Sequence, residues 1–264
     1  MGFTKFGVVG VVLAEVILVG SLWAFDTSVV NDVVTLGSNQ QTTITVINTE
    51  SKPIAIEVTP VKRQYTREGV EKFDGETSDV VAIPSQMILN PGEEQVVALR
   101  WVGPVTIDKE HAFRILVENV PIELSTTNVG QPAANRASGQ IRMVYRIVKS
   151  FYVQPPGATS RLKVVSAQFG VDPKKNKTFD LVMTNDGSAH EIVRRCELDV
   201  TLMNPSDPSA NAIVMPAKFD SQDLSGGVNF LVDEERLIQL PVPKTWQVPK
   251  GYQPVSAVFR KSES

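Results

Sequence analysis

Hydrophobic and polar residues alternate along most of the chain after residue 25, in short segments separated by turn residues. Residues 42–48 (TTITVIN) alternate and are rich in β-branched side chains, TESKP then supplies a turn, and residues 54–61 (IAIEVTPV) alternate again. Successive side chains of a strand point to opposite faces, so a period of two predicts strands, and β-branched residues favour them.

Further segments of the same kind occur later in the chain. Residues 86–102 place a Pro-Gly turn between two apolar strands, and residues 112–122 and 141–153 predict two more strands. No segment of ten or more residues after the N-terminal one shows helical spacing. Many short strands with turn signals about every dozen residues predict an all-β fold built as a β-sandwich.

Two stretches interrupt this pattern. Residues 123–139 are small and polar and predict a long loop between two strands. Residues 154–160 (QPPGATS) predict a linker, because the prolines stiffen it and the glycine allows a bend. A second strand-rich block comes after the linker. We therefore predict two domains, 25–154 and 155–264, each of normal size for one sandwich.

The N-terminal segment predicts export. Lys5 precedes an apolar run at 6–23, and Ala24 ends that run before polar residues, which is typical of a secretory signal peptide at 1–24. An uncleaved membrane anchor is the alternative, because the run is long enough to span a bilayer. Glu15 would cost a few kcal/mol in a permanent membrane helix and favours the transient signal. Leu22 is larger than ideal for cleavage after Ala24, which leaves the exact site open.

Charge and cysteine content narrow the possible partners. The net charge of −3 and the pI of about 5.6 give the whole chain no attraction to nucleic acid or to an anionic membrane. Cys196 is the single cysteine, so no intrachain disulfide can form. It could pair with another chain, but we expect a small buried hydrophobic residue.

The sequence lacks the residues that catalysis or metal binding needs. His111 and His190 are the only histidines, and neither stands near a cysteine or a carboxylate pair at ligand spacing. No Ser-His-Asp constellation, phosphate loop or dinucleotide fingerprint is present. Ser160 and Lys163 fit a four-letter serine-x-x-lysine pattern by chance, without its partner motifs. We expect no enzyme, no cofactor, no metal and no small-molecule substrate.

Four pieces of the sequence occur in an order that resembles a known family. They are residues 83–101 (IPSQMILNPGEEQVVALRW), residues 110–122 (EHAFRILVENVPI), a polar loop, and residues 141–157 (IRMVYRIVKSFYVQPPG). This order is similar to the periplasmic chaperones of chaperone–usher pili, the PapD-like family, over about residues 30–156. In the second half, residues 184–192 (TNDGSAHEI) resemble an asparagine-containing strand and turn of the family.

The resemblance implies two immunoglobulin-like β-sandwiches with a cleft between them. It also implies a periplasmic chaperone for pilus subunits that lack the last strand of their own fold. The last strand of the first domain, about residues 141–152, would be donated to the subunit by β-augmentation. Pilus subunits and an outer-membrane usher are then the expected partners. Self-association through the same exposed strand is plausible on physical grounds.

The pattern and the family alignment point to different donor rows in that strand. By pattern, the apolar row is Ile141, Met143, Tyr145 and Ile147. Counting back from the family's lysine instead gives Gln140, Arg142 and Val144, which is poorly apolar. We favour the pattern, because a β-bulge shifts the register by one residue. The alternative is that the odd row faces the protein's own core.

Family members hold the subunit's terminal carboxylate in the cleft with an arginine and a lysine. Lys149 matches the lysine, whereas the first strand has Asn31 or Asp32 where the arginine is usual. Arg114, in the sequence HAFRIL, is the expected replacement, with Arg146 as the runner-up. A guanidinium suits a carboxylate because it donates two parallel hydrogen bonds.

Two other functions compete with the chaperone. A structural or adhesive surface protein would be retained by its N-terminal segment and would not need an available strand at 141–152. A binding module for glycans or peptides would need a solvent-facing aromatic cluster. Trp101 and Trp246 lie in different halves of the chain and give that interpretation little support.

Overall fold

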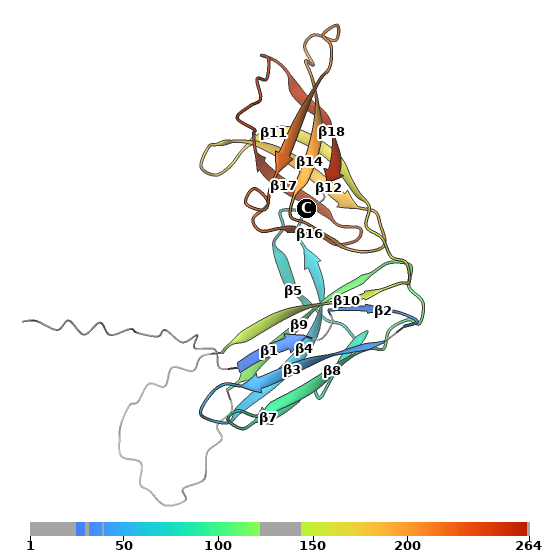
Figure 1. The fold of residues 1–264 in the computed structure, drawn as a ribbon, viewed down its shortest axis with the longest axis vertical. Coiled ribbons are helices and arrows are strands. Elements are labelled where there is room, and N and C mark those ends of the chain that lie inside the picture. Colours follow the sequence, from blue (N-terminus) through green and yellow to red (C-terminus); the bar gives the residue numbers. More distant parts are fainter. Residues whose placement is uncertain (1–24, 30–31, 39, 122–143, 263–264) are drawn as a thin grey trace, which may run out of the picture.

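The computed structural model describes residues 25–29, 32–38, 40–121 and 144–262. The predicted signal peptide, the predicted polar loop, and Ile141 and Met143 lie outside these residues. The described chain consists of strands and turns without a helix, so the all-β prediction is confirmed (Figure 1). Within this described part, no helix is present that could cross a membrane.

The first half is a sandwich of two sheets. One sheet has the order β1-β3-β8-β6, and the other has the order β2-β10-β9-β4-β5, with β7 also paired to β4. The strands are β1 (Phe25–Val29), β2 (Val33–Thr35), β3 (Gln41–Asn48), β4 (Ile54–Tyr65), β5 (Glu71–Gly75), β6 (Val80–Ile83), β7 (Gln86–Leu89), β8 (Glu94–Trp101), β9 (His111–Val120) and β10 (Arg146–Gln154).

Alternation along these strands builds the first core. In β3 the side chains of Thr42, Ile44, Val46 and Asn48 are buried, and those between them are only partly covered. Ile44 and Val46 belong to one core cluster with Phe113, Phe151 and other buried residues of the opposite sheet. Full burial of one large apolar side chain contributes about 1.5–3 kcal/mol, so this packing is what fixes the register of the strands.

The second half has its own core around Phe179, Leu198, Val200 and Phe230. Its strands form the orders β11-β12-β17, β13-β16 and β15-β14-β18. They are β11 (Leu162–Val171), β12 (Lys177–Asn185), β13 (Glu191–Val193), β14 (Cys196–Met203), β15 (Ile213–Phe219), β16 (Val228–Phe230), β17 (Glu235–Pro241) and β18 (Gln253–Lys261).

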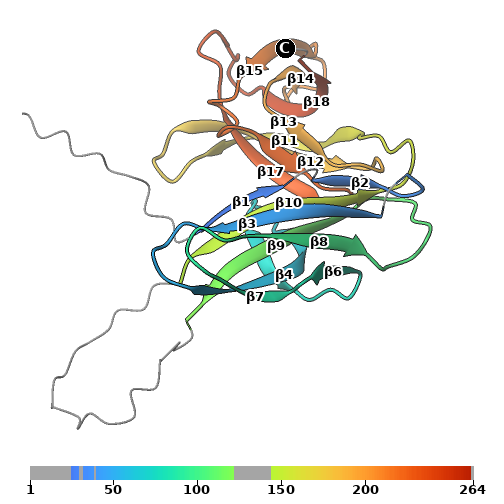
Figure 2. The same ribbon diagram turned by 60° about the horizontal axis from the view of Figure 1, so that its bottom comes forward.

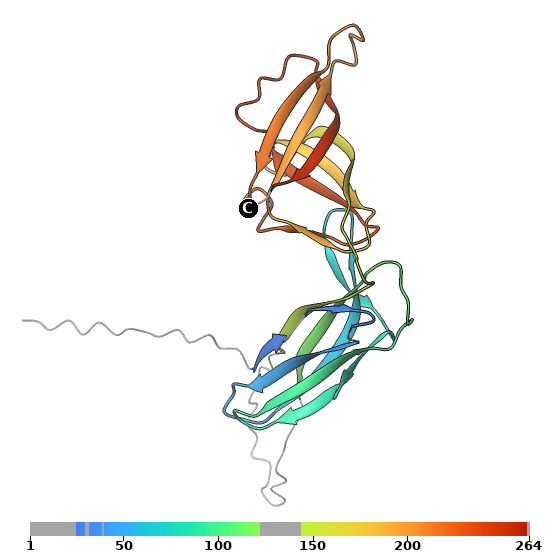
Figure 3. The same cartoon turned by 45° about the vertical axis from the view of Figure 1, so that its right-hand side comes forward.

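The two halves contact each other at several places besides the connecting chain (Figures 1 and 3). The hairpin of β4 and β5 reaches toward the second half, where the Leu237 N–H donates to the Arg67 carbonyl at 2.7 Å. On another side, the Glu110 N–H donates to the Ser188 carbonyl at 3.0 Å. Figure 2 shows the two sheets of the first half stacked on each other below the strands of the second half.

Candidate functional site

Strand β10 has one paired edge and one largely open edge. Its pairing with β9 is antiparallel and runs from Arg146 opposite Glu118 to Val153 opposite His111. On the other edge, β2 pairs in parallel only with residues 152–154. No other described strand pairs with β10, so this edge is open from Arg146 to Phe151 within the described chain.

Two hydrogen bonds show which backbone groups face the open edge. The Asn119 N–H donates to the Tyr145 carbonyl on the β9 side at 3.2 Å, whereas the Tyr152 N–H donates to the Asp32 carbonyl on the β2 side at 2.8 Å. Backbone groups alternate between the two edges of an antiparallel strand. The backbone groups of Arg146, Val148 and Ser150 therefore point to the open edge, where an added strand could bind them.

The side chains of β10 also divide into two rows. Tyr145, Ile147, Phe151 and Val153 belong to the core of the first half or pack against it. Val144 is 57% exposed and belongs to the other row, with Arg146, Val148 and Ser150.

This arrangement bears on the predicted donor row. The structure places Tyr145 and Ile147 against the domain's own core, which is the alternative that the sequence pattern left open. They lie there because odd positions of β10 continue the row of Phe151 and Val153. Ile141 and Met143 lie outside the described residues.

Arg114 lies at the centre of a charged cluster on the outward face of the same sheet. Its Nε and Nη2 atoms donate to the two carboxylate oxygens of Glu71 at 2.6 and 2.8 Å, and its Nη1 donates to the Ser150 hydroxyl at 2.6 Å. Arg63 donates from Nε to the same Glu71 carboxylate at 2.7 Å. β4, β5, β9 and β10 thus each contribute one side chain to the cluster.

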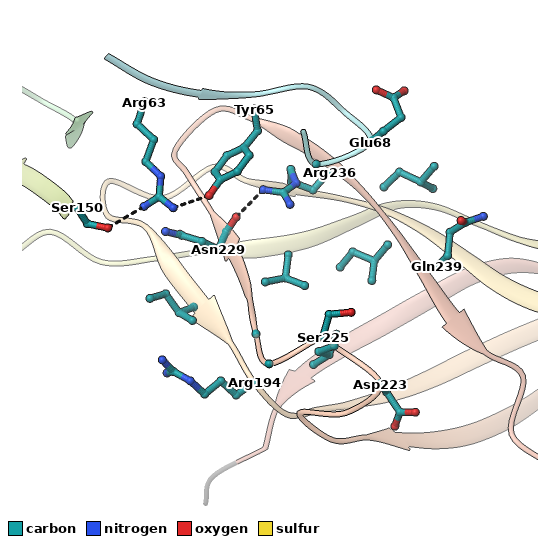
Figure 4. A pocket seen from close by; sticks show the side chains of 18 of the residues that line it. Arg63, Tyr65, Glu68, Ser150, Arg194, Asp223, Ser225, Asn229, Arg236 and Gln239 are labelled. Atoms are coloured by element: carbon teal, nitrogen blue, oxygen red, sulfur yellow. Dashed lines mark hydrogen bonds between the residues drawn. The ribbon is translucent and has the colours of Figure 1, made fainter. Parts of the chain in front are cut away.

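Several hydrogen bonds fix the side chain of Arg63. It also donates to the hydroxyls of Tyr65 and Tyr152, and its Nη1 lies 3.5 Å from the Ser150 hydroxyl (Figure 4). Its side chain is only 5% exposed. A buried guanidinium needs a full set of acceptors, and Glu71 with the two phenols supplies it.

Burial and the charges of this cluster act in opposite directions on the pKa values of Glu71 and Tyr152. Burial raises the pKa of Glu71, but the hydrogen bond and charge of Arg114 together with the charge of Arg63 outweigh burial, so the pKa lies below its ordinary value. Burial also raises the pKa of Tyr152, against the charge of Arg63 and the hydrogen bonds of the phenol. At neutral pH the cluster therefore contains two cations and one ionised carboxylate.

The structure does not bring Lys149 and Arg114 to the same face. Lys149 pairs with Ile115, whereas Ser150 pairs with Arg114, so the two charged side chains start on opposite faces of the sheet. Lys149 is half-buried and has no hydrogen-bond or ion-pair partner among the described residues. Arg146 is bound by Glu118 across the strand pair at 2.8 Å, in an exposed position.

A cavity of about 610 Å³ opens between the two halves beside this cluster. Arg63, Arg114, Ser150 and Tyr152 line it from the first half. The second half contributes Arg194, Asp223, Asn229, Arg236 and Gln239, among others (Figure 4). The guanidinium of Arg236 stacks on the Tyr65 ring at 4.2 Å and donates to the Asn229 carbonyl at 2.9 Å. The predicted cleft between the domains thus has a predominantly cationic lining.

Glu110 connects the two halves at the other end of β10. Its carboxylate is 1% exposed and lies 2.8 Å from the His190 Nδ1. The Gln154 side-chain amide donates to the same carboxylate. The His190 ring stacks on Tyr152 with a centroid distance of 3.8 Å, and the Tyr152 hydroxyl accepts a hydrogen bond from Asn229. This end of β10 is therefore part of the contact between the halves.

Cys196, Trp101 and Trp246 lie in or against the two hydrophobic cores. Cys196 is buried, and burial followed by the charge of Asp223 raises the pKa of its thiol to about 11, so the prediction of a small buried residue is confirmed. Trp101 is buried in the first core and Trp246 packs against the second, so neither belongs to a solvent-facing aromatic cluster. Among the described residues, no group of three or more metal-ligating side chains occurs.

The sequence did not indicate a role for Arg63, Glu71 or Glu110. Strand register brings the first two to Arg114 across three strands, and neither follows a motif in the sequence. The only available signal was the charged character of Arg63 inside a strand with buried neighbours, since a charge there needs a partner.

Residues 30–159 match the family described as the pili and flagellar-assembly chaperone, PapD N-terminal domain. The match includes strands β2 to β10 and so the open edge and the Arg114 cluster. The sequence has no significant match among curated proteins.

Several solved structures are similar. The YadV chaperone is 11% identical, with a TM-score of 0.48, over 90% of this chain and 100% of that one. A chaperone–tip adhesin complex of CFA/I fimbriae is 14% identical, with a TM-score of 0.47, over 80% of this chain and 87% of that one. The chaperone–tip adhesion subunit pre-assembly complex of Csu pili from Acinetobacter baumannii is 10% identical, with a TM-score of 0.45, covering 82% and 90%.

Proposed function

Because residues 30–159 belong to the PapD N-terminal domain family, we propose that this chain binds and delivers incomplete pilus subunits by donating strand β10 to them. The observation that carries the proposal is the edge of β10 from Arg146 to Phe151, which no strand of the described residues pairs with. Unpaired backbone groups on a subunit and on this edge would satisfy each other, as in other cases of β-augmentation. The role is one of binding, without catalysis.

We propose that the outward row of β10 contacts the subunit, because the odd positions Tyr145 and Ile147 pack on the domain's own core. Val144 is exposed and Val148 is half-exposed on this row. Leu116 of β9 pairs with Val148 on the same face but is itself buried, so the exposed apolar side chains of this row are those of Val144 and Val148. This outward row includes Val144, which is also a donor position according to the family alignment. Ile141 and Met143 stay predicted donors further along the chain.

The proposed carboxylate anchor is Lys149. Arg114 lies on the opposite face of the sheet, where it binds Glu71, and is the alternative anchor. Lys149 has no partner among the described residues, so it can bind an arriving carboxylate without first losing an ion pair. Burial of the Lys149 ammonium and the subunit carboxylate would strengthen their attraction, because the local dielectric constant falls.

The same proposal covers the domains, the export segment and the usher. Domains at 25–154 and 155–264 would place the subunit against the first domain and leave the second to support the cleft. Export by the segment 1–24 would place the chaperone in the periplasm. There it would pass its subunit to an outer-membrane usher.

The test is co-expression of the mature chain, residues 25–264, with the fimbrial-type subunits encoded beside its gene. We expect a subunit to survive only in a one-to-one complex that a pull-down recovers. Val144→Asp should abolish the complex, whereas Val96→Asp, an equivalent change at an exposed position of β8, should retain it. Loss with Met143→Asp but not with Val144→Asp would reverse the donor row.

A charge reversal tests the anchor separately. Lys149→Glu should abolish capture in a folded protein, and Lys62→Glu, the same change at an exposed lysine of β4, should leave capture unchanged. Normal capture by the Lys149 variant would rule out the carboxylate role. If no neighbouring gene encodes a subunit and none copurifies, the structural or adhesive interpretation becomes the better one.

A further inference from the structure

We propose that the tip of the β4–β5 hairpin, residues 65–70, is a detachable strap across the cleft between the two halves. In the free protein the strap lies on the free edge of β17, and its release opens the cleft to an extended polypeptide. The movement of the strap is independent of the proposed function, whereas the identity of the polypeptide as a pilus subunit rests on it.

The hairpin projects beyond the sheet to which it belongs. β9 pairs with β4 only as far as Lys62, and among the described strands β5 pairs only with the last part of β4, from Lys62 to Tyr65. The sheet therefore supports the hairpin at its base but not at its tip (Figure 1). Inside the tip, the Thr66 N–H donates to the Val70 carbonyl at 2.8 Å. This bond does not involve the second half, so the tip can keep its shape when it moves.

The strap binds β17 along the edge that faces away from β12. The sheet order β11-β12-β17 leaves this edge without a strand partner among the described residues. There the Leu237 N–H donates to the Arg67 carbonyl at 2.7 Å, as it would to an added strand. Just before β17, Glu234 Oε1 accepts a hydrogen bond from the Tyr65 N–H at 3.2 Å. The strap thus occupies a position on β17 that another extended chain could take.

The side-chain contacts of the strap with β17 are polar and partly exposed. The guanidinium of Arg236 lies over the Tyr65 ring at 4.2 Å (Figure 4). The Arg67 and Glu235 side chains approach to 3.9 Å and are 56% and 52% exposed, so this ion pair contributes little in water. Small polar contacts of this kind are typical of surfaces within one chain that move relative to each other.

Other contacts keep the two halves joined when the strap leaves β17. The Glu110 N–H donates to the Ser188 carbonyl at 3.0 Å, and the Asn229 amide donates to the Tyr152 hydroxyl at 2.9 Å. None of these four residues belongs to the strap. Release of the strap is therefore a local opening and not a separation of the two halves.

The strap forms part of the wall of the cleft. Tyr65, Glu68 and Gly69 line the cavity of about 610 Å³ from the first half, and Leu237 and Gln239 line it from β17. Release removes the three strap residues from the wall and frees the Leu237 N–H. Because backbone groups alternate between the two edges of a strand, those of Gln239 face the same edge as those of Leu237. An extended polypeptide in the opened cleft could therefore pair with β17.

The competing explanation is that the hairpin is a fixed brace, which leaves β17 only when the second half unfolds. The two explanations differ in hydrogen exchange at two neighbouring amides. The Leu237 N–H is bound to the strap, whereas alternation directs the Ile238 N–H to β12, where Ile238 pairs with Leu181. Strap release exposes the first amide and leaves the second protected, but unfolding exposes both.

The experiment measures amide hydrogen exchange of the mature chain, residues 25–264, by NMR. In the wild type the Leu237 amide should exchange faster than the Ile238 amide, each relative to its intrinsic rate. Tyr65→Ala removes the ring beneath Arg236 and should speed exchange at Leu237 by about 2- to 30-fold, the range for loss of one cation–π contact, without changing Ile238. Equally slow exchange of the two amides in the wild type, or an equal response of both to Tyr65→Ala, would overturn the proposal.

Two glycines with the same backbone conformation provide a matched control. Gly69 and Gly37 both have a φ of +88°, so alanine at either position strains a left-handed backbone to a similar extent. A Cβ on Gly69 would lie 2.7 Å from Arg236 Nη2, whereas a Cβ on Gly37 would meet nothing within 4 Å among the described residues beyond its chain neighbours. Gly69→Ala should speed exchange at Leu237, and Gly37→Ala should leave it unchanged. An equal response to both substitutions would show that the strap does not protect Leu237.

A competition pull-down separates the role of the strap from the proposed function. Gly69→Ala and Gly37→Ala chains with different tags compete for a limiting amount of one subunit. If the cleft must open before a subunit binds, the chain with the larger open fraction should capture more of it. Equal capture would rule out that the strap controls access to the cleft. If neither variant nor the wild type captures a subunit, the proposed function fails, and the exchange measurement still decides whether the strap detaches.

Discussion

The two ends of β10 differ more than any sequence pattern suggests. From Phe151 to Val153 the strand is buried and paired with β9 on one edge. From Tyr152 onward it also pairs with β2 on the other edge, and the Tyr152 ring stacks on His190 of the second half. From Arg146 to Ser150 it is partly exposed and paired on one edge only among the described strands. The buried end of β10 therefore fixes the strand in the first half, whereas the backbone groups along its exposed end stay available to an added strand.

The largest expected change in the free energy of unfolding comes from a substitution at the buried end of β10. Phe151→Ala removes a fully buried ring and should lower the free energy of unfolding by about 3–5 kcal/mol, because the cavity it leaves is only partly closed. Val144→Ala at the exposed end should change it by less than about 0.5 kcal/mol. Urea unfolding of both variants measures the contrast, and equal losses would contradict the division of the strand.

A smaller effect is expected at the contact between the halves. Glu110→Ala leaves the His190 ring nitrogen and the Gln154 amide without their carboxylate partner, and should cost about 1–3 kcal/mol. Thermal unfolding of Glu110→Ala, His190→Ala and the double variant gives the coupling energy. Additive losses would show that Glu110 and His190 do not interact.

The pH dependence of the free energy of unfolding tests the charged cluster around Arg114. The folded-state pKa of Glu71 lies below its unfolded value, so the cluster adds stability above the unfolded pKa of about 4.3 and loses it as pH falls through the folded pKa. Glu71→Gln should flatten the unfolding profile of the wild type in this acidic range. Parallel profiles would show that Glu71 is not stabilised in its ionised form.

The smallest effect is expected at Lys149. Lys149→Ala should change the free energy of unfolding by less than about 0.5 kcal/mol, because the described structure gives the ammonium group no partner to lose. The same variant should weaken subunit capture in the pull-down. A large loss of stability would mean that Lys149 has a structural role in the free protein.

Part of the site was predictable because it depends on local pattern. Period-two alternation located the strands that became β3, β4, β9 and β10, and the Pro-Gly turn located the connection between β7 and β8. The same alternation could not say which row of β10 faces inward. Both rows contain apolar residues, and burial depends on the facing sheet, where Ile44 contributes to the core that Ile147 packs against.

The sequence by itself determined the all-β fold, the absence of an intrachain disulfide and the residues available for charge recognition, since these depend on composition and on neighbours along the chain. Only the tertiary structure decided that Arg114 binds Glu71 while Lys149 lies on the opposite face without a partner among the described residues. The physical reason is that cross-strand register joins residues 43 positions apart, and one step along a strand reverses the face on which a charge lies.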